Sequence, residues 1–80
     1  MLMKKSVILT FPQHLIKEPV IFKMAKKFHV MPNIRRAQVT GTVGEMELEL
    51  EGTEEDLEKG LQSLRDQGVN VELIQGDIVE

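Results

Sequence analysis

Eighty residues suffice for one domain and are too few for two separate hydrophobic cores, so we expect a single domain over residues 1–80, with an ordered core of about residues 3–75. Hydrophobic residues make up 41% of the chain and charged residues 29%, which excludes the composition of a disordered protein. The absence of cysteine excludes disulfides and thiolate metal sites, and the net charge of −3 argues against nucleic-acid binding.

The first third of the chain predicts a strand followed by a helix. Residues Lys4–Phe11 are rich in β-branched side chains and stop at Pro12, which cannot donate a hydrogen bond to a neighbouring strand. Pro19 has the fixed φ that suits the first turn of a helix. Apolar residues then recur at helical spacing as far as Phe28, with lysines on the opposite side, so we expect an amphipathic helix.

The middle of the chain predicts a hairpin. Residues 33–42 and 46–51 read as two strands joined by a glycine-containing turn. If Gly41 faces Gly44, apolar pairs lie on one face of the hairpin and an Arg–Glu pair lies on the other. In this register Ile34, at the start of the first strand, would point away from the core, so we expect a bulge near Arg35. The expected register places Val39 opposite Met46, Ala37 opposite Leu48 and Arg36 opposite Glu49.

The last third predicts a helix and a short strand. Thr53, followed three residues later by Asp56, resembles a capping box before a stripe of leucines, and Gly68 supplies the C-terminal stop. Apolar and polar side chains alternate over residues 69–73, which predicts a final strand. We expect the tail Gln75–Glu80 to be loosely held.

This order of elements predicts the fold class. Strand, helix, strand, strand, helix, strand is the pattern of a ferredoxin-like βαββαβ sandwich of the α+β class, a four-stranded antiparallel sheet with two helices on one face. The strand at residues 33–42 then lies at a sheet edge. Arg35 and Arg36 on that strand either blunt edge-to-edge aggregation or pair across a two-fold axis in a dimer.

Few side chains suit catalysis or metal binding. Ser6 and Ser63 lie inside predicted elements, and neither His14 nor His29 has a catalytic partner in view. The alternating glutamates of residues 45–51 stand roughly 6.5–7 Å apart along a strand, too far for one strand to wrap a calcium ion. An RNA-binding sheet of this topology requires aromatic residues on its exposed central strands, and no phenylalanine lies there. We therefore expect no enzyme activity, no metal, no cofactor and no nucleic-acid partner.

The hydrophobic runs bear on where the protein works. Ser6–Phe11 is too short for the core of a secretory signal, and no run approaches the roughly 20 apolar residues that cross a bilayer. We expect a cytoplasmic protein without membrane insertion. Burial in so short a chain leaves little net stability, and without disulfides we expect oligomerisation to supply more.

Three stretches carry a resemblance to a known family. Leu9–Ile21, Asn33–Ala37 and Gly44–Gly52 resemble the NIL domain, and the match spans nearly the whole chain. The family is named for Asn-Ile-Leu at the start of its second strand. Here Asn33 and Ile34 are followed by Arg35 in place of leucine.

The resemblance implies a ferredoxin-like, ACT-like fold that dimerises and binds its ligand near the subunit interface, which assigns ligand binding to Asn33, Ile34 and Arg35. In the methionine ABC importer, such a domain follows the ATPase and inhibits transport when methionine accumulates. Elsewhere the family is fused to iron–sulfur ferredoxin modules. The present chain has neither ATPase motifs nor cysteine, so it resembles a sensor or adaptor without its usual effector.

Asn33 fits a ligand role because its amide both donates and accepts hydrogen bonds, and so can engage the ammonium and carboxylate groups of an amino acid. It follows Met31 and Pro32, where a second subunit could complete an apolar pocket around a thioether. The alternative is that Asn33 only caps the turn after Pro32.

Two functions follow as expectations. The first is a homodimeric regulatory module that binds a small sulfur-containing amino acid such as methionine. The alternative is an adaptor that docks through its open edge strand onto an enzyme or transporter of sulfur amino-acid metabolism, and Arg35 in place of leucine motivates it.

Overall fold

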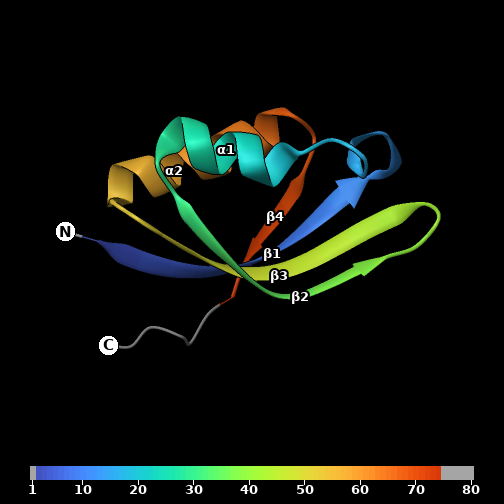
Figure 1. The fold of residues 1–80 in the computed structure, drawn as a ribbon, viewed down its shortest axis with the longest axis horizontal. Helices are drawn as coiled ribbons and strands as arrows, with labels where there is room; N and C mark the ends of the chain where they lie inside the picture. Colours follow the sequence, from blue (N-terminus) through green and yellow to red (C-terminus); the bar gives the residue numbers. More distant parts are fainter. Residues whose placement is uncertain (1, 75–80) are drawn as a thin grey trace.

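The computed structural model describes residues 2–74, and the prediction made for the tail Gln75–Glu80 lies outside the described residues. Four strands pair antiparallel in the order β2-β3-β1-β4, and both helices cover one face of the sheet (Figure 1). The predicted α+β, ferredoxin-like βαββαβ fold is confirmed, and β2 lies at an edge as expected. The elements are β1 (Met3–Pro12), the 3-10 turn η1 (Gln13–Leu15), α1 (Val20–Phe28), β2 (Met31–Val39), β3 (Val43–Gly52), α2 (Glu54–Asp66) and β4 (Asn70–Leu73).

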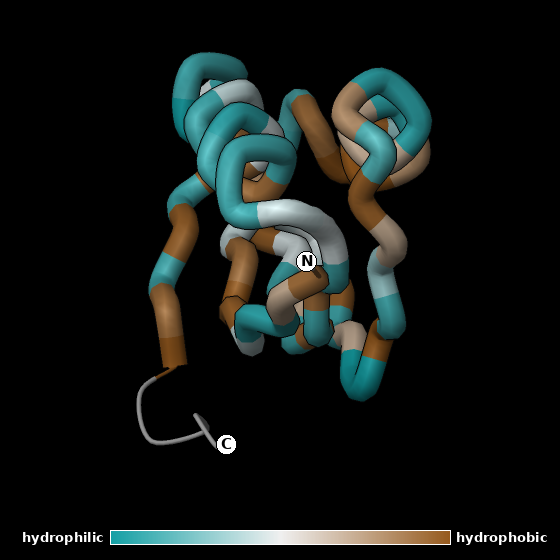
Figure 2. The backbone as a smooth tube through the Cα atoms, turned by 90° about the vertical axis from the view of Figure 1, so that its left-hand side faces the viewer, coloured by the Kyte–Doolittle hydropathy of each residue, from teal (hydrophilic) through white to brown (hydrophobic). Residues whose placement is uncertain are grey.

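The core lies between the two helices and the sheet face beneath them, and Figure 2 shows the helices side by side over the strands. The central strands β1 and β3 turn every second side chain toward the helices, and the helices turn their apolar stripes toward the sheet. We call this sheet side the helix face and the other side the open face. The buried hydrophobic residues are Val7, Leu9, Phe11, Val20, Met24, Val30, Leu48, Leu50, Leu57, Leu61, Leu64 and Val69.

The ends of α2 follow the predicted signals. The Thr53 hydroxyl oxygen accepts a hydrogen bond from the backbone N–H of Asp56 at 3.1 Å, which satisfies one free donor of the first helical turn. Gly68 ends the helix with φ of 102°, a conformation that glycine adopts at no steric cost. α1 likewise begins directly after Pro19.

β2 begins at Met31, earlier than the predicted start at Asn33. The reason is His29, which ends α1 in the left-handed conformation with φ of 60°. This sharp reversal buries Val30 and brings Met31 directly opposite Glu51 of β3. Met31 and Pro32 therefore already belong to the sheet.

Replacing His29 by glycine should stabilise the fold. A side chain with a Cβ atom costs about 1–2 kcal/mol in the left-handed conformation, and the greater freedom of glycine in the unfolded chain offsets part of this gain. We expect urea unfolding of His29→Gly to show a higher midpoint with an unchanged slope. His14→Gly is the matched control, because His14 is exposed and has an ordinary φ, and it should bring no gain. An unchanged or lower midpoint for His29→Gly would contradict the expectation.

The hairpin register was predicted wrongly by two residues. Val39 lies opposite Gly44, and Arg36 lies opposite Glu47 rather than Glu49. The cause is Thr40, whose backbone N–H donates to the Val43 carbonyl at 2.8 Å and whose hydroxyl oxygen accepts from the Val43 N–H at 3.1 Å. The turn is therefore centred one residue earlier than expected, and Ala37 lies opposite Met46 instead of Leu48.

The predicted bulge near Arg35 is confirmed, because the pairing of β2 with β3 shifts between Ile34 and Arg36. Ile34 lies opposite the buried Leu48, so the bulge turns Ile34 toward the helix face. Without it, Ile34 would share the open face with the glutamates of β3.

Candidate functional site

The three residues expected to bind a ligand lie together on β2 and are all exposed. Asn33 lies opposite Glu49 on the open face, whereas Ile34 lies opposite Leu48 on the helix face. Arg35 is the bulged residue between the two stretches of regular pairing. Within one subunit these side chains do not converge on a common pocket, and their ligand-binding role stays a prediction.

Both arginines of β2 pair with glutamates of β3 across the open face. The Arg35 Nη2 atom lies 3.4 Å from Glu49 Oε2, and the Arg36 Nη2 atom lies 2.8 Å from Glu47 Oε1. All four side chains contact solvent, so each pair contributes at most about 1 kcal/mol to stability. The glutamate row thus forms a solvated surface with cross-strand partners.

The helix-face side chains of β2 form an exposed apolar row, although their partners on β3 are largely covered. Ile34 is 53% exposed and Val39 is 65% exposed. The β2–β3 hairpin extends past the N-terminal end of α1 (Figure 1). We call Pro32, Ile34, Ala37 and Val39 the β2 apolar row.

A shallow groove lies at the start of β2, between that strand and the C-terminal half of α1. Its walls are mostly apolar, and Phe22 and Met31 are exposed there. Asn33 follows directly on two of its lining residues, Met31 and Pro32. The groove residues are Phe22, Ala25, Lys26, His29, Val30, Met31 and Pro32.

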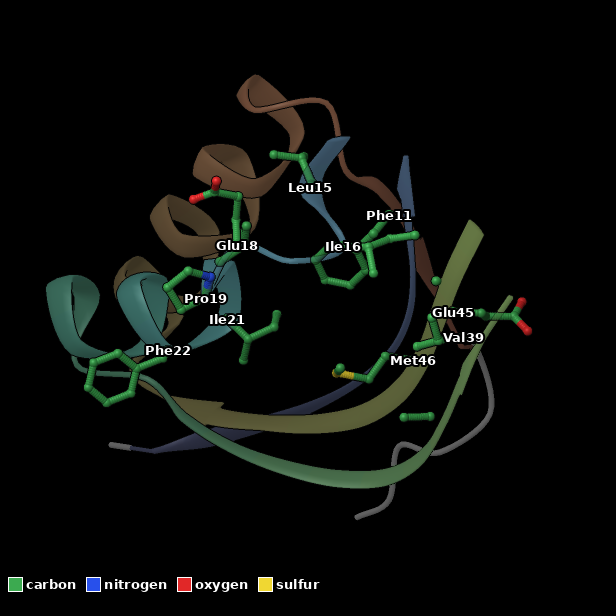
Figure 3. A pocket seen from close by; sticks show the side chains of 13 residues that line it. Phe11, Leu15, Ile16, Glu18, Pro19, Ile21, Phe22, Val39, Glu45 and Met46 are labelled. Carbon is green, nitrogen blue, oxygen red and sulfur yellow. The ribbon is translucent and has the colours of Figure 1, made fainter. Parts of the chain in front are cut away.

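A deeper cavity of about 230 Å³ lies at the opposite end of β2, under the segment that joins β1 to α1. Figure 3 shows Phe11, Ile16, Ile21 and Met46 around the hollow, whereas the carboxylates of Glu18 and Glu45 point away from it. The sequence interpretation missed this cavity. Its lining residues are Phe11, Leu15, Ile16, Glu18, Pro19, Val20, Ile21, Phe22, Ala37, Val39, Gly44, Glu45 and Met46.

The ionisable side chains of residues 2–74 show no arrangement typical of catalysis. Glu55 raises the pKa of Lys59 through a hydrogen bond and its charge. Both residues are exposed on α2, and they do not line a pocket together. Over the same residues, no three histidine, aspartate or glutamate side chains gather closely enough to hold a metal ion. No helix in that range has the length and apolar character needed to span a membrane.

Comparison with solved structures shows likeness to a natural domain and to a designed protein. The C-terminal domain of an ABC transporter ATP-binding protein from Enterococcus faecalis superposes with a TM-score of 0.79 at 26% sequence identity, over 91% of this chain and 86% of that chain. A de novo designed protein, Foldit4, shares the fold with a TM-score of 0.58 at 12% identity, over 92% of this chain and 94% of the design. No curated protein matches the sequence.

Comparison with family models gives the assignment. The NIL domain model matches residues 5–73, from β1 through β4, and so covers the whole sheet and both helices. The matched segment contains the Asn33-Ile34 pair at the start of the second strand, as well as the β2 edge and both hollows described above. The chain belongs to the NIL domain family.

Proposed function

We propose that this NIL domain is a non-catalytic regulatory module that binds a small sulfur-containing amino acid, such as methionine, at the interface of a homodimer. The observation that carries the proposal is the edge strand β2, which exposes an apolar row and holds the Asn-Ile pair of the family motif. Likeness to a domain appended to an ABC transporter ATP-binding protein supports a regulatory role over a catalytic one.

The edge strand supports a dimer. Along its free side β2 offers backbone donors and acceptors that no strand within residues 2–74 uses. Two copies of β2 related by a two-fold axis run antiparallel, so they can pair and extend the sheet across both subunits. Ile34 and Val39 would lose solvent contact in that arrangement, which adds the hydrophobic burial that so short a chain lacks.

The start of β2 supports an amino-acid site at that interface. A ligand at the start of β2, before the residues that pair with the second copy, can be contacted from both faces of the sheet. Asn33 on the open face and the apolar groove beside Pro32 can therefore reach the same molecule. The Asn33 amide would engage the charged amino-acid groups. The groove, closed by the second subunit, would hold the thioether chain.

Isothermal titration with methionine, homocysteine and cysteine tests this proposal. We expect saturable heat with at least one of them, and Asn33→Ala should weaken its binding at least about tenfold, since hydrogen bonds to charged groups contribute about 1.5–3 kcal/mol. The fold should survive, because Asn33 is exposed. Gln38→Ala is the matched control, since Gln38 is another exposed amide on the open face of β2.

Two outcomes would overturn the amino-acid proposal. One is the absence of heat and of chemical-shift change with all three amino acids at millimolar concentration. The other is equal binding by the Asn33→Ala and Gln38→Ala variants. Unfolding of Asn33→Ala would instead identify Asn33 as a structural residue that caps the turn after Pro32.

A second candidate function is that of an adaptor for an enzyme or transporter of sulfur amino-acid metabolism. The open edge of β2 favours it, because such an edge can accept a strand from another protein while the apolar row provides contacts for alternate side chains. Purification of the tagged chain from its native host separates the two functions. A stoichiometric partner without bound amino acid supports the adaptor, and recovery of the chain alone counts against it.

A further inference from the structure

The cavity at the far end of β2 is separate from the groove beside Asn33. It is built by the η1–α1 segment above, the end of β1 at the back and the β2–β3 hairpin below (Figure 3). None of Asn33, Ile34 and Arg35 lines it. Any ligand of this cavity is therefore recognised by residues other than the three in the family motif.

The chemistry of the walls selects an uncharged ligand. Apolar side chains surround the hollow, and the carboxylates of Glu18 and Glu45 are turned outward (Figure 3). A charged or strongly polar group entering the cavity would lose its hydration without gaining a partner. The Met46 sulfur points into the hollow, and its polarisable thioether makes favourable contacts with sulfur-containing and aromatic groups.

No steric clash explains why Gly44, which lines the cavity, is a glycine. A Cβ atom at Gly44 would lie 3.5 Å from Ile16 Cγ1, 3.8 Å from Phe11 Cβ and 3.9 Å from Val39 Cγ2, which are ordinary contact distances. Gly44 also has no positive φ that would require glycine. An alanine would fit and would fill part of the hollow, so packing alone does not account for glycine at this position.

The size of the cavity limits the ligand to a small group. The hollow has a volume of about 230 Å³ and is open to solvent on one side, so it accommodates a short alkyl or thioether chain. We propose that this cavity binds a small uncharged thioether or alkyl group, independently of the amino-acid site at Asn33. The proposal stands whether or not Asn33 binds an amino acid.

Methionine methyl groups give a direct test on the full chain. With methionine labelled at its ¹³C-methyl group, Met46 reports on the cavity, Met24 on the buried core and Met31 on the groove beside Asn33. Titration with diethyl sulfide should shift the Met46 signal saturably and leave the Met24 signal in place, while the Met31 signal reports separately on any binding in the groove. Butylammonium and butyrate, which are similar in size but charged, should leave all three signals unchanged.

Two glycine variants make a matched pair for the titration. Gly44→Ala should weaken diethyl sulfide binding about tenfold, the effect that one methyl group has in an apolar pocket. Gly41→Ala adds the same methyl group in the hairpin turn, where nothing lies within 4 Å, and should bind as the parent does. Ala37→Leu fills the cavity from the exposed edge strand and should reproduce the loss if Gly44→Ala fails to fold.

Asn33→Ala separates the two sites, because it should weaken amino-acid binding and leave the response of Met46 to diethyl sulfide intact. A Met46 signal that does not saturate with diethyl sulfide overturns the cavity proposal, as do equal responses to the charged compounds or equal effects of the two glycine variants.

Discussion

Ile34→Lys is expected to convert the proposed homodimer into a folded monomer. Ile34 is half exposed at the edge of the sheet, so lysine at this position leaves the core of the subunit intact. In a two-fold interface the substitution occurs twice, and each copy loses a buried isoleucine and brings a charge into an apolar contact. We expect dimerisation to weaken at least about 100-fold, since burying one such side chain contributes about 1.5–3 kcal/mol.

Sedimentation equilibrium over a range of protein concentrations measures this effect, with circular dichroism to show that the fold is retained. Leu73→Lys is the matched control, because Leu73 is a similarly exposed aliphatic residue on the same sheet face, at the opposite edge in β4. It should leave dimerisation unchanged. A strictly monomeric parent at high concentration, or dissociation by Leu73→Lys instead, would rule out β2 as the dimer edge.

Leu57→Ala is expected to remove most of the stability of the fold. The Leu57 side chain on α2 is fully buried, and truncation of such a leucine costs about 2–5 kcal/mol through lost burial and the space left behind. Small domains are often stabilised by only about 5 kcal/mol in total. The variant should therefore unfold at a much lower urea concentration than the parent.

Urea unfolding followed by circular dichroism checks the prediction for Leu57. Leu2→Ala provides the control, because Leu2 is largely exposed and its truncation should change the free energy of unfolding by less than about 0.5 kcal/mol. Similar, small effects of the two substitutions would show that α2 does not pack over the sheet as described.

The order of elements could be predicted because each element has a local signal, such as Pro19 before α1, Thr53 before α2 and Gly68 after it. The hairpin register could not be predicted from the sequence. A slip of two residues keeps every side chain on its own face, so the alternation of apolar and polar residues is the same in both registers. The hydrogen bonds of Thr40 select the observed one, and nothing in the alternation indicates them.

The candidate sites were predictable to different degrees. Asn33 and its neighbours could be chosen from the sequence because the family motif occupies consecutive positions on one strand. The cavity could not, because its walls come from segments far apart in the chain, such as Ile16 and Met46. The only sequence signal was the apolar pair Leu15-Ile16, which lies between the predicted first strand and the predicted first helix.

The bulge at Arg35 has a consequence for how this family can diversify. Arg35 has no directly opposite partner on β3, so its side chain is released from the strict alternation that fixes Ile34 and Arg36. Leucine and arginine can therefore be exchanged at this position without reversing the orientation of either neighbour. The third residue of the motif is thus a position where evolution can alter the surface chemistry of the β2 edge while the framework stays constant.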